Sequence, residues 1–324
     1  SIPNLFRYYG VSEAFTIKQT GHVPFGSQSL YALIPSLWQI VSTRPDVVFF
    51  REEQIGWLLS WFIKDFIYEM HSYDDRLARY YPRLVSRSRA TTVVSQGLKD
   101  AGVRAGLDDA KLHVHPAGVD VADFDIGITK ASARAHLGID VRDRLVMYAG
   151  RLNRAKGVEV LVEATRFLPE GFHVLFIGGF EGEPEALQEF ARGSGLERRV
   201  TIAGAKPHSE IPLCLAAADV LVAPNVPISA EWSDYTSPLK LFEFMAARRP
   251  VVASDIPAIR EILDESSATL VPPGNAESLA QGIVHAANGG PSVDAATLRA
   301  FAIAEGRSWV ARAGDILRDA GFDI

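Results

Sequence analysis

Short apolar runs alternate with helical segments along most of the chain, and this alternation limits the possible folds more than any other feature. The runs are residues 46–50, 66–70, 90–95, 112–115, 145–149, 173–177, 200–203, 220–224, 251–253 and 268–271. Runs of this length are typical of strands that are buried on both faces. Because a helical pattern follows nearly every run, we expect parallel strands joined by helical crossovers in doubly wound α/β sheets.

The length of 324 residues exceeds what one hydrophobic core usually spans, so we expect two such domains. The alternation restarts after a mixed connection over residues 120–143. We therefore predict a first domain over residues 1–118, a second over 119–300, and a helix over 301–324 that crosses back to the first. Two doubly wound domains bind ligands at the carboxyl ends of their strands, in a cleft between them. The chain starts at Ser1 in mid-pattern, so we expect the first elements of its first domain to precede it.

Charge and cysteine content exclude some classes of function. The net charge of −6 argues against nucleic acid as a partner. Residues 1–118 carry 13 Lys and Arg against 11 Asp and Glu, so this part is the one suited to anionic partners. A single cysteine, Cys214, excludes internal disulfides and fits a reducing compartment. With no signal peptide or spanning segment in view, we expect a cytoplasmic protein.

The segment from residue 237 to 255 predicts an anion site. Ser237 is suited to an N-cap and Pro238 to the first helical position. The helix start leaves free N–H groups, from Leu239 and Lys240, at the positive end of the helix dipole, where phosphate binds readily. Glu243 follows within the same helix and could accept hydrogen bonds from a diol. Phosphate and diol together are what a nucleotide presents, although a simple cap with a solvated glutamate is the alternative.

A second segment, YAGRLNRAKG at residues 148–157, joins a strand to a helix at a carboxyl edge. Gly150 permits close approach of a ligand to the backbone. Arg151 and Lys156 place a planar fork and a point charge on one loop, which suits the two phosphates of a diphosphate. A solvated loop with ordinary surface cations is the alternative interpretation.

Five segments in order resemble the retaining nucleotide-sugar glycosyltransferases of family 4. They are residues 117–120 (AGVD), 148–164, 200–211 (VTIAGAKPHSEI), 241–254 (LFEFMAARRPVVAS) and 270–279. Each motif is moderately specific, and their common order makes the resemblance specific over most of residues 90–310. The resemblance implies a GT-B fold, in which two Rossmann-like domains face an interdomain cleft.

The resemblance also implies residue roles. Arg151 and Lys156 would neutralise the donor diphosphate, and Glu243 would bind the ribose hydroxyls. By position, His71 resembles the active-site histidine that reaches the transferred sugar, and histidine suits hydrogen bonding or proton exchange near neutral pH. Residues 200–211 resemble the segment that lines the nucleobase pocket, and His208 lies within it.

The family pattern has a further glutamate eight positions before Glu243, but this chain has Tyr235 there. Asp234 and Glu231, in the preceding loop, are candidate substitutes, and solvated side chains are the alternative. No cluster of His, Asp and Glu has the spacing of metal ligands, so we expect neither a metal nor another cofactor. The family likewise uses protein cations in place of a metal.

These features predict an enzyme that moves a sugar from a UDP-, GDP- or ADP-sugar to a hydroxyl acceptor, such as a glycan or a lipid-linked sugar, with retention of configuration. A nucleotide-sugar epimerase of similar architecture and a non-catalytic sugar-nucleotide binding protein are the alternatives. The basic segment 76–89, in which we expect a helix over residues 77–87 and in which arginines alternate with aromatic residues, could contact anionic headgroups on the inner face of a membrane. An ordinary solvated basic face is the alternative there.

Overall fold

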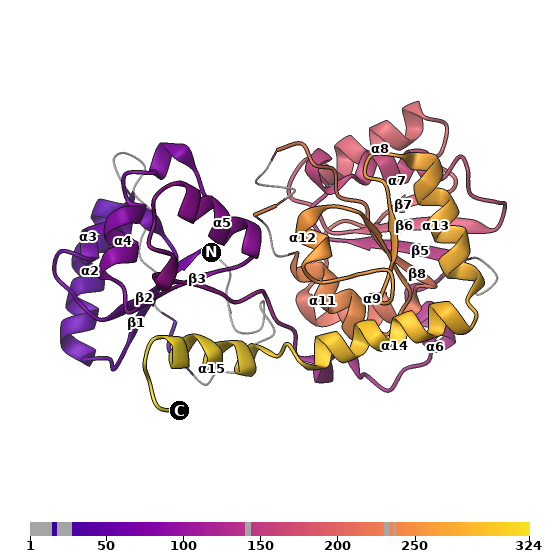
Figure 1. Cartoon of the computed structure of the whole chain (residues 1–324). Helices are drawn as coiled ribbons and strands as arrows, with labels where there is room; N and C mark the ends of the chain where they lie inside the picture. The colour runs from indigo at the N-terminus through magenta and orange to yellow at the C-terminus, as the bar shows by residue number, and fades with distance from the viewer. Residues whose placement is uncertain (1–14, 18–27, 140–143, 230–233, 236–237) are drawn as a thin grey trace. The chain divides into compact units, whose positions relative to one another are not determined.

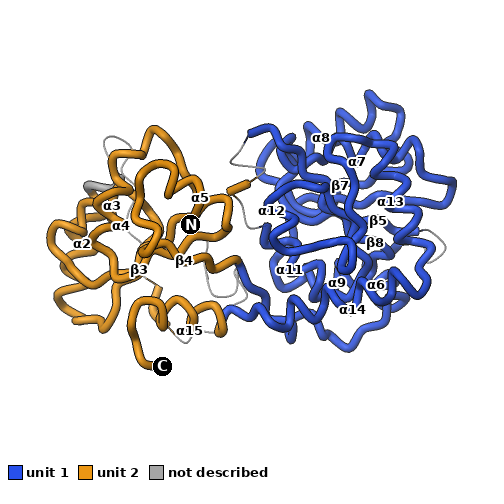
Figure 2. Tube along the Cα trace, in the orientation of Figure 1, with its two compact units in different colours: residues 1–11, 117–233, 238–309 blue, residues 12–116, 234–237, 310–324 orange. Residues whose placement is uncertain are grey.

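The computed structural model describes residues 15–17, 28–139, 144–229, 234–235 and 238–324. These residues form two compact units (Figure 2). Unit 1 comprises the described residues of 117–233 and 238–309, and unit 2 comprises those of 12–116, 234–237 and 310–324. Ser237 and Glu231 lie outside the described residues.

Unit 2 contains a sheet of four parallel strands in the order β1-β2-β3-β4 (Figure 1). The strands are β1 (Val48–Phe50), β2 (Phe66–Met70), β3 (Ala90–Val93) and β4 (Leu112–Val114). The helices are α2 (Gln28–Thr43), α3 (Glu53–Leu59), α4 (Tyr81–Arg87), α5 (Gln96–Arg104) and α15 (Trp309–Asp319). The expected alternation of strands and helices is confirmed in this unit.

Side chains of β2 alternate between two cores because successive residues of a strand point to opposite faces. Phe66, Tyr68 and Met70 pack in a cluster with Tyr81 and Leu84 of α4. On the other face, Ile67 packs with Ile316, in the last turn of α15, and with Ala320, just beyond that helix. The last helix of the chain therefore belongs to the same unit as residues 28–116.

Unit 1 contains a sheet of six parallel strands in the order β10-β9-β8-β5-β6-β7. The strands are β5 (Arg144–Ala149), β6 (Phe172–Ile177), β7 (Val200–Ile202), β8 (Val220–Ala223), β9 (Val251–Ser254) and β10 (Thr269–Val271). The chain moves outward in one direction from β5 to β7 and then in the other from β8 to β10. This is the doubly wound order, and its switch point, where ligands bind, lies between β5 and β8.

Helices cover both faces of this sheet in two layers (Figure 1). The first layer contains α6 (Lys130–Leu137), α9 (Ile211–Ala217), α11 (Leu239–Ala246), α12 (Pro257–Arg260) and α14 (Pro291–Glu305). The second contains α7 (Val158–Ala164), α8 (Glu183–Gly193) and α13 (Ala276–Asn288). The two predicted Rossmann-like domains are thus confirmed as parallel sheets with their helices.

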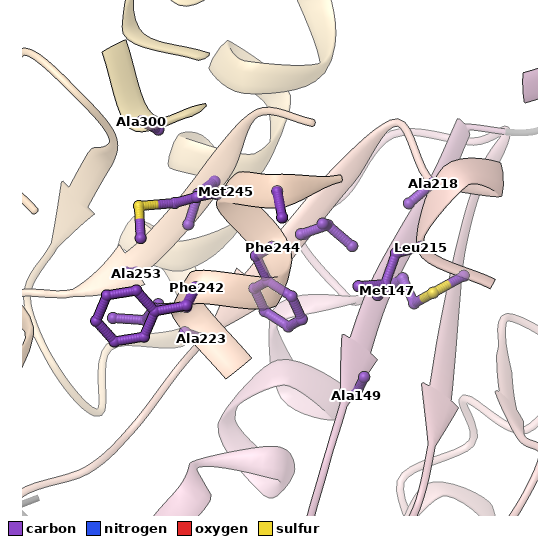
Figure 3. Packing of buried hydrophobic residues seen from close by; sticks show 14 of the residues in the cluster. Met147, Ala149, Leu215, Ala218, Ala223, Phe242, Phe244, Met245, Ala253 and Ala300 are labelled. Carbon is purple, nitrogen blue, oxygen red and sulfur yellow. The ribbon is translucent and has the colours of Figure 1, made fainter. Parts of the chain in front are cut away.

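Helix α11 packs through its apolar residues, which buries one side of it against the sheet. Leu241, Phe242, Phe244 and Met245 are all buried in the cluster that also contains Met147 and Ala149 of β5 and Ala223 of β8 (Figure 3). Burying four side chains of this size contributes on the order of 6–12 kcal/mol of transfer free energy as an upper estimate. The packing leaves Lys240 and Glu243 on the remaining side, near the start of the helix.

Three expectations about helices were wrong. Helix α11 begins at Leu239, and Pro238 is its N-cap rather than its first helical residue. The expected helix over 77–87 is divided into η1 (Asp75–Leu77) and α4, because Pro82 is suited only to the first turn of a helix. The final helix is likewise divided into α14 and α15, and Gly306 is the C-cap of the first.

Within the described residues, none of the helices has the length and apolar character needed to cross a membrane.

Candidate functional site

The loop after β5 packs tightly against the loop after β6, at the carboxyl edge of the sheet of unit 1. Gly150 has φ +134°, its N–H donates to the Ile177 carbonyl at 2.9 Å, and its carbonyl accepts from the Gly179 N–H at 3.0 Å. A Cβ atom added to Gly178 would come within 2.2 Å of the Gly150 carbonyl oxygen. Glycines are therefore required for this approach of two backbones.

The turn that carries Lys156 is held against the end of β8. Gly157 has φ +69°, and a Cβ atom at this position would lie 1.7 Å from the Pro224 carbonyl oxygen. The Val226 N–H donates to the Ala155 carbonyl at 3.1 Å. The loops after β5 and β8 thus meet at the switch point of the sheet and present Lys156 there.

The Lys240 side chain extends from the first turn of α11 to the loop after β5. Its ammonium donates to the Tyr148 hydroxyl and lies 3.8 Å from the centre of the Tyr148 ring. The same nitrogen lies 3.1 Å from where a Cβ atom of Gly150 would be. Burial, and secondly the nearby Lys156, hold the pKa of Lys240 well below its ordinary value, while Glu243 acts in the opposite direction. Among the described residues, no carboxylate lies within ion-pairing distance of this ammonium.

Arg151 is held by other groups of unit 1. Its guanidinium makes a two-pronged ion pair with Glu183, at 2.6 and 3.0 Å, and lies 3.8 Å from the centre of the Phe180 ring. Glu183 also accepts from the N–H groups of Leu152 and Phe180. The Arg151 guanidinium and these amides lower the pKa of Glu183 to about 2. The Arg151 charge is therefore partly balanced, and its orientation is fixed by the first residue of α8.

Glu243 lies beside the loop that follows β7. Its Oε1 is 3.9 Å from Nδ1 of His208, at the start of the short helix η5 (His208–Glu210). Burial raises the pKa of Glu243, and His208 and Lys240 oppose this rise. A carboxylate that is recessed but not fully covered, next to a loop of this kind, can accept two hydrogen bonds from a diol.

These groups together can bind a polyanion that also carries a diol. Two lysines approach one glycine-lined loop at the start of a helix, and a carboxylate lies one turn further along. An anion between the lysines would remove the repulsion between them. Within the described part of the chain, no group of three or more His, Cys, Asp or Glu residues is arranged to hold a metal ion.

Part of the chain is similar to known glycosyltransferases. Residues 143–288 match the family of glycosyl transferases of group 1. The D-inositol 3-phosphate glycosyltransferase of Xylanimonas cellulosilytica is 30% identical over 175 residues, which are 51% of this chain and 40% of that protein. The amylovoran biosynthesis glycosyltransferase AmsK of Erwinia amylovora is 28% identical over 229 residues, or 69% of this chain and 54% of that protein.

The chain therefore spans about half, or less, of the curated glycosyltransferases that it matches. Among solved structures, Anabaena HepE in complex with UDP and glucose has a TM-score of 0.74 and 21% identity. The similarity covers 92% of this chain and 83% of HepE. This likeness, together with the two parallel sheets, shows the GT-B fold.

Within unit 1, the structure brings four predicted residues together. Gly150, Lys156, Lys240 and Glu243 lie around the same loop of unit 1. Leu239 begins α11, and its side chain is exposed.

Arg151 also lies in unit 1, whereas His71 and Asp234 lie in unit 2. His71 follows the end of β2 directly and is exposed. The Asp234 carbonyl accepts from the Ser95 hydroxyl at 3.1 Å, and Tyr235 packs against the aromatic cluster that contains Tyr81. The Asp234 and Tyr235 segment is thus attached to unit 2, although α11 follows it in the sequence.

Sequence reasoning missed three contributions to the site. The Lys240 ammonium was overlooked because only its backbone N–H was considered, although its spacing from Glu243 on the polar side of α11 is a usable signal. Tyr148 was taken as an ordinary strand residue. Glu183 carries no local motif, since it lies 32 positions from the arginine that it orients.

Proposed function

We propose that this protein transfers a sugar from a nucleoside diphosphate sugar to a hydroxyl acceptor. The observation that carries the proposal is the approach of Lys156 and Lys240 to the glycine loop at the switch point, one helical turn from Glu243. The two lysines suit the diphosphate, and Glu243 suits the ribose diol. The similarity to HepE, which was solved with UDP and glucose, supports a donor of this class.

The chemistry that the site would assist is the departure of the diphosphate. As the bond between the anomeric carbon and the diphosphate oxygen breaks, its electron pair moves onto the diphosphate. The acceptor oxygen bonds to the same carbon, and its proton passes to the departing diphosphate. Cations fixed in advance stabilise the negative charge where it develops. Arg151, Lys156 and Lys240 would supply this charge without a metal, and we propose transfer with retention of configuration, as the family resemblance implies.

The remaining site residues are proposals of the same kind. We assign to His71 contact with the transferred sugar, and to the N–H groups of Leu239 and Lys240 contact with phosphate. Ser237 and Asp234 are retained as donor-binding candidates. For the acceptor, a glycan is the class most consistent with relatives such as AmsK, which is named for amylovoran biosynthesis.

Loss of either loop cation tests the function. The donor is first chosen from UDP-, GDP- and ADP-sugars by the thermal shift that it produces, since a ligand that binds only the folded state raises Tm. With that donor, we expect Lys156→Ala or Arg151→Ala to lower turnover by about 10²-fold or more, because each removes a charge-stabilising group.

Arg154→Ala is the matched control, because Arg154 is an exposed cation on the same turn as Lys156. We expect it to retain turnover within about twofold, as surface substitutions usually do. Near-normal turnover of Lys156→Ala would refute the assignment. Consumption of donor without any acceptor, accompanied by release of nucleotide, would favour the epimerase. Donor binding without even slow hydrolysis would favour a non-catalytic binding protein.

We also propose peripheral contact with an anionic membrane on its cytoplasmic side, through helix α2 of unit 2. Ile34, Trp38 and Val41 recur at helical spacing and are 75%, 66% and 72% exposed. An exposed apolar helix face of this kind is typical of interfacial helices. Cations occur in the same unit, including Arg83, whose guanidinium lies 3.5 Å from the centre of the Trp61 ring.

Co-sedimentation with vesicles tests the membrane proposal. We expect binding to vesicles that contain phosphatidylglycerol and weaker binding to vesicles of phosphatidylcholine alone. The double change Ile34→Ser and Trp38→Ser should abolish sedimentation, because it removes most of the apolar area that would be buried. Val103→Ser, on the exposed side of α5, is the control and should bind normally. Unchanged sedimentation of the double variant would refute contact through α2.

A further inference from the structure

A second cavity in unit 1 lies at the opposite end of α11 from the proposed donor site. It has a volume of about 270 Å³. Its wall is formed by residues 124–129 before and at the N-cap of α6, by Ala216 of α9, by Ala246 of α11 and by Phe301 of α14. Since β9 begins soon after α11 ends, the cavity lies at the amino edge of the strands. The Lys240 site lies at the carboxyl edge, so the two places are separated by the length of the sheet.

Two consecutive arginines, Arg248 and Arg249, line this cavity. Within the part of the chain that the structure describes, no carboxylate lies within 4.0 Å of either guanidinium. Asp125 also lines the cavity but makes no ion pair with them. Two cations that face one recess without an ion-pair partner favour an anionic ligand, for the same electrostatic reason as the two lysines of the donor site.

Arg249 has hydrogen-bonding capacity that no protein group uses. Its Nη2 donates to the Ala216 carbonyl at 2.7 Å, whereas its Nε is buried and has no partner. Burial also lowers the pKa of this guanidinium, which means that its charge is poorly solvated. Buried donors are nearly always paired in folded proteins, so an unpaired Nε requires an explanation.

Arg248 has an unfavourable backbone conformation for its residue type. It follows the end of α11 with φ +51°, in the left-handed region, which glycine adopts without strain and other residues adopt at a cost. Its guanidinium lies 3.9 Å from the centre of the Phe301 ring, at the wall of the cavity. Strained residues persist where the side chain serves a purpose that glycine cannot serve.

The alternative explanation is that both arginines only complement the negative ends of α9 and α11. That accounts for the bond from Arg249 to the Ala216 carbonyl. It does not account for the unpaired Nε, nor for an arginine rather than glycine at the strained position 248. It also leaves the recess itself unexplained.

We propose that this cavity is a second anion site, which takes a small molecule with a phosphate monoester, such as a sugar phosphate. Arginine forks match the geometry of phosphate oxygens. The volume is just below the roughly 300–1,000 Å³ that is usual for ligand pockets, so a single sugar ring with its phosphate is the expected size. The site does not depend on the proposed transferase function.

Replacement of Arg248 by glycine separates a binding role from a structural one. Arg248→Gly removes the guanidinium and relieves the backbone strain. We expect an unchanged or higher Tm without ligand, and a dissociation constant for glucose 6-phosphate that rises about tenfold or more, as loss of a charge-assisted bond predicts. Isothermal titration and thermal shift measure both quantities. Unchanged affinity for glucose 6-phosphate would overturn the proposal, whatever the Tm of the variant.

Two further measurements define the site and its ligand. In Lys156→Ala, the binding that is sensitive to Arg248 should persist, whereas its loss would show that the anion occupies the donor site instead. Inorganic phosphate should bind more weakly than glucose 6-phosphate, because the cavity has room for the sugar. Equal or tighter binding of inorganic phosphate would overturn the assignment of a sugar phosphate.

Discussion

Lys240 is the residue whose environment most affects the proposed chemistry. Its ammonium contacts Tyr148 and lies near Gly150 and Lys156, in a place that disfavours a positive charge. In the free protein this arrangement lowers the pKa of Lys240, mainly through burial. A bound diphosphate would reverse the effect, because an adjacent negative charge favours the protonated form. The residue thus links donor binding to proton uptake.

A pH dependence of donor binding follows from the lowered pKa of Lys240. Above that pKa the free protein holds Lys240 neutral, so binding must take up a proton and affinity falls as pH rises. The fall should approach tenfold per pH unit until the pKa of the bound state is reached. Titration calorimetry in two buffers of different ionisation enthalpy measures the proton uptake.

Two variants provide the controls for this titration. Lys240→Arg keeps the charge at all accessible pH values, so its affinity for nucleoside diphosphate should be flat on the alkaline side. Lys240→Met should bind weakly and take up no proton. Glu243, whose pKa is raised by burial, is present in both variants and contributes equally to their titrations. A wild-type affinity that is flat from neutral to alkaline pH would contradict the assigned role.

The same lowered pKa predicts how the stability of the free protein changes with pH. Between the lowered value and 10.5, the unfolded chain binds a proton at this position that the folded protein has released. The contribution of Lys240 to the free energy of unfolding therefore rises with pH across this window. Lys240→Met should lose this contribution.

At the scale of elements, the turns after β5, β6 and β8 position the site. They approach one another so closely that glycine is required by both its backbone conformation and its small size, as at Gly157 and Gly178. The apolar pattern of α11 has a matching effect, because burying residues 241, 242, 244 and 245 leaves Lys240 and Glu243 directed away from the core. Local patterns of this kind can be recognised from the sequence without a structure.

A pair of glycine variants separates strain from steric overlap. Gly157 and Gly138 have nearly equal φ angles of +69° and +66°, but only Gly157 has a backbone oxygen within 1.7 Å of an added Cβ. We expect Gly138→Ala to cost about 1–2 kcal/mol of unfolding free energy from strain alone. Gly157→Ala should cost more than 4 kcal/mol or displace the Lys156 turn, which denaturant titration and donor affinity would reveal. Equal stability of the two variants would contradict the close packing of this turn.

At the scale of the molecule, contacts between distant segments complete each unit. In unit 2, the buried carboxylate of Glu69 on β2 pairs with Arg51 and, at 2.9 Å, with Arg312 on α15. The His115 ring, on the residue that follows β4, contacts Asp319 of the same helix at 3.0 Å. Helix α15 thereby packs in unit 2 with a sheet whose last strand ends nearly 200 residues earlier in the chain. These ion pairs accompany the apolar contact of Ile316 with Ile67.

Most of the architecture could be predicted from the sequence. Strand β2 has the predicted bounds, and the other strands begin and end within two residues of the predicted positions. The errors at Pro238, Pro82 and Gly306 concern where helices begin and end. Such ends depend on one or two residues rather than on a repeated pattern.

The alternation of strands and helices, the glycine loop with its cations and the polar side of α11 follow from the sequence, because each depends on residues close together in the chain. Contacts between distant segments are what bring Lys240 to Gly150, Glu183 to Arg151, and Arg248 and Arg249 to the wall of a cavity. The physical reason is the reversal of strand order between β5 and β8. It brings together loops that are about 70 residues apart, and no local pattern records which side chains meet there.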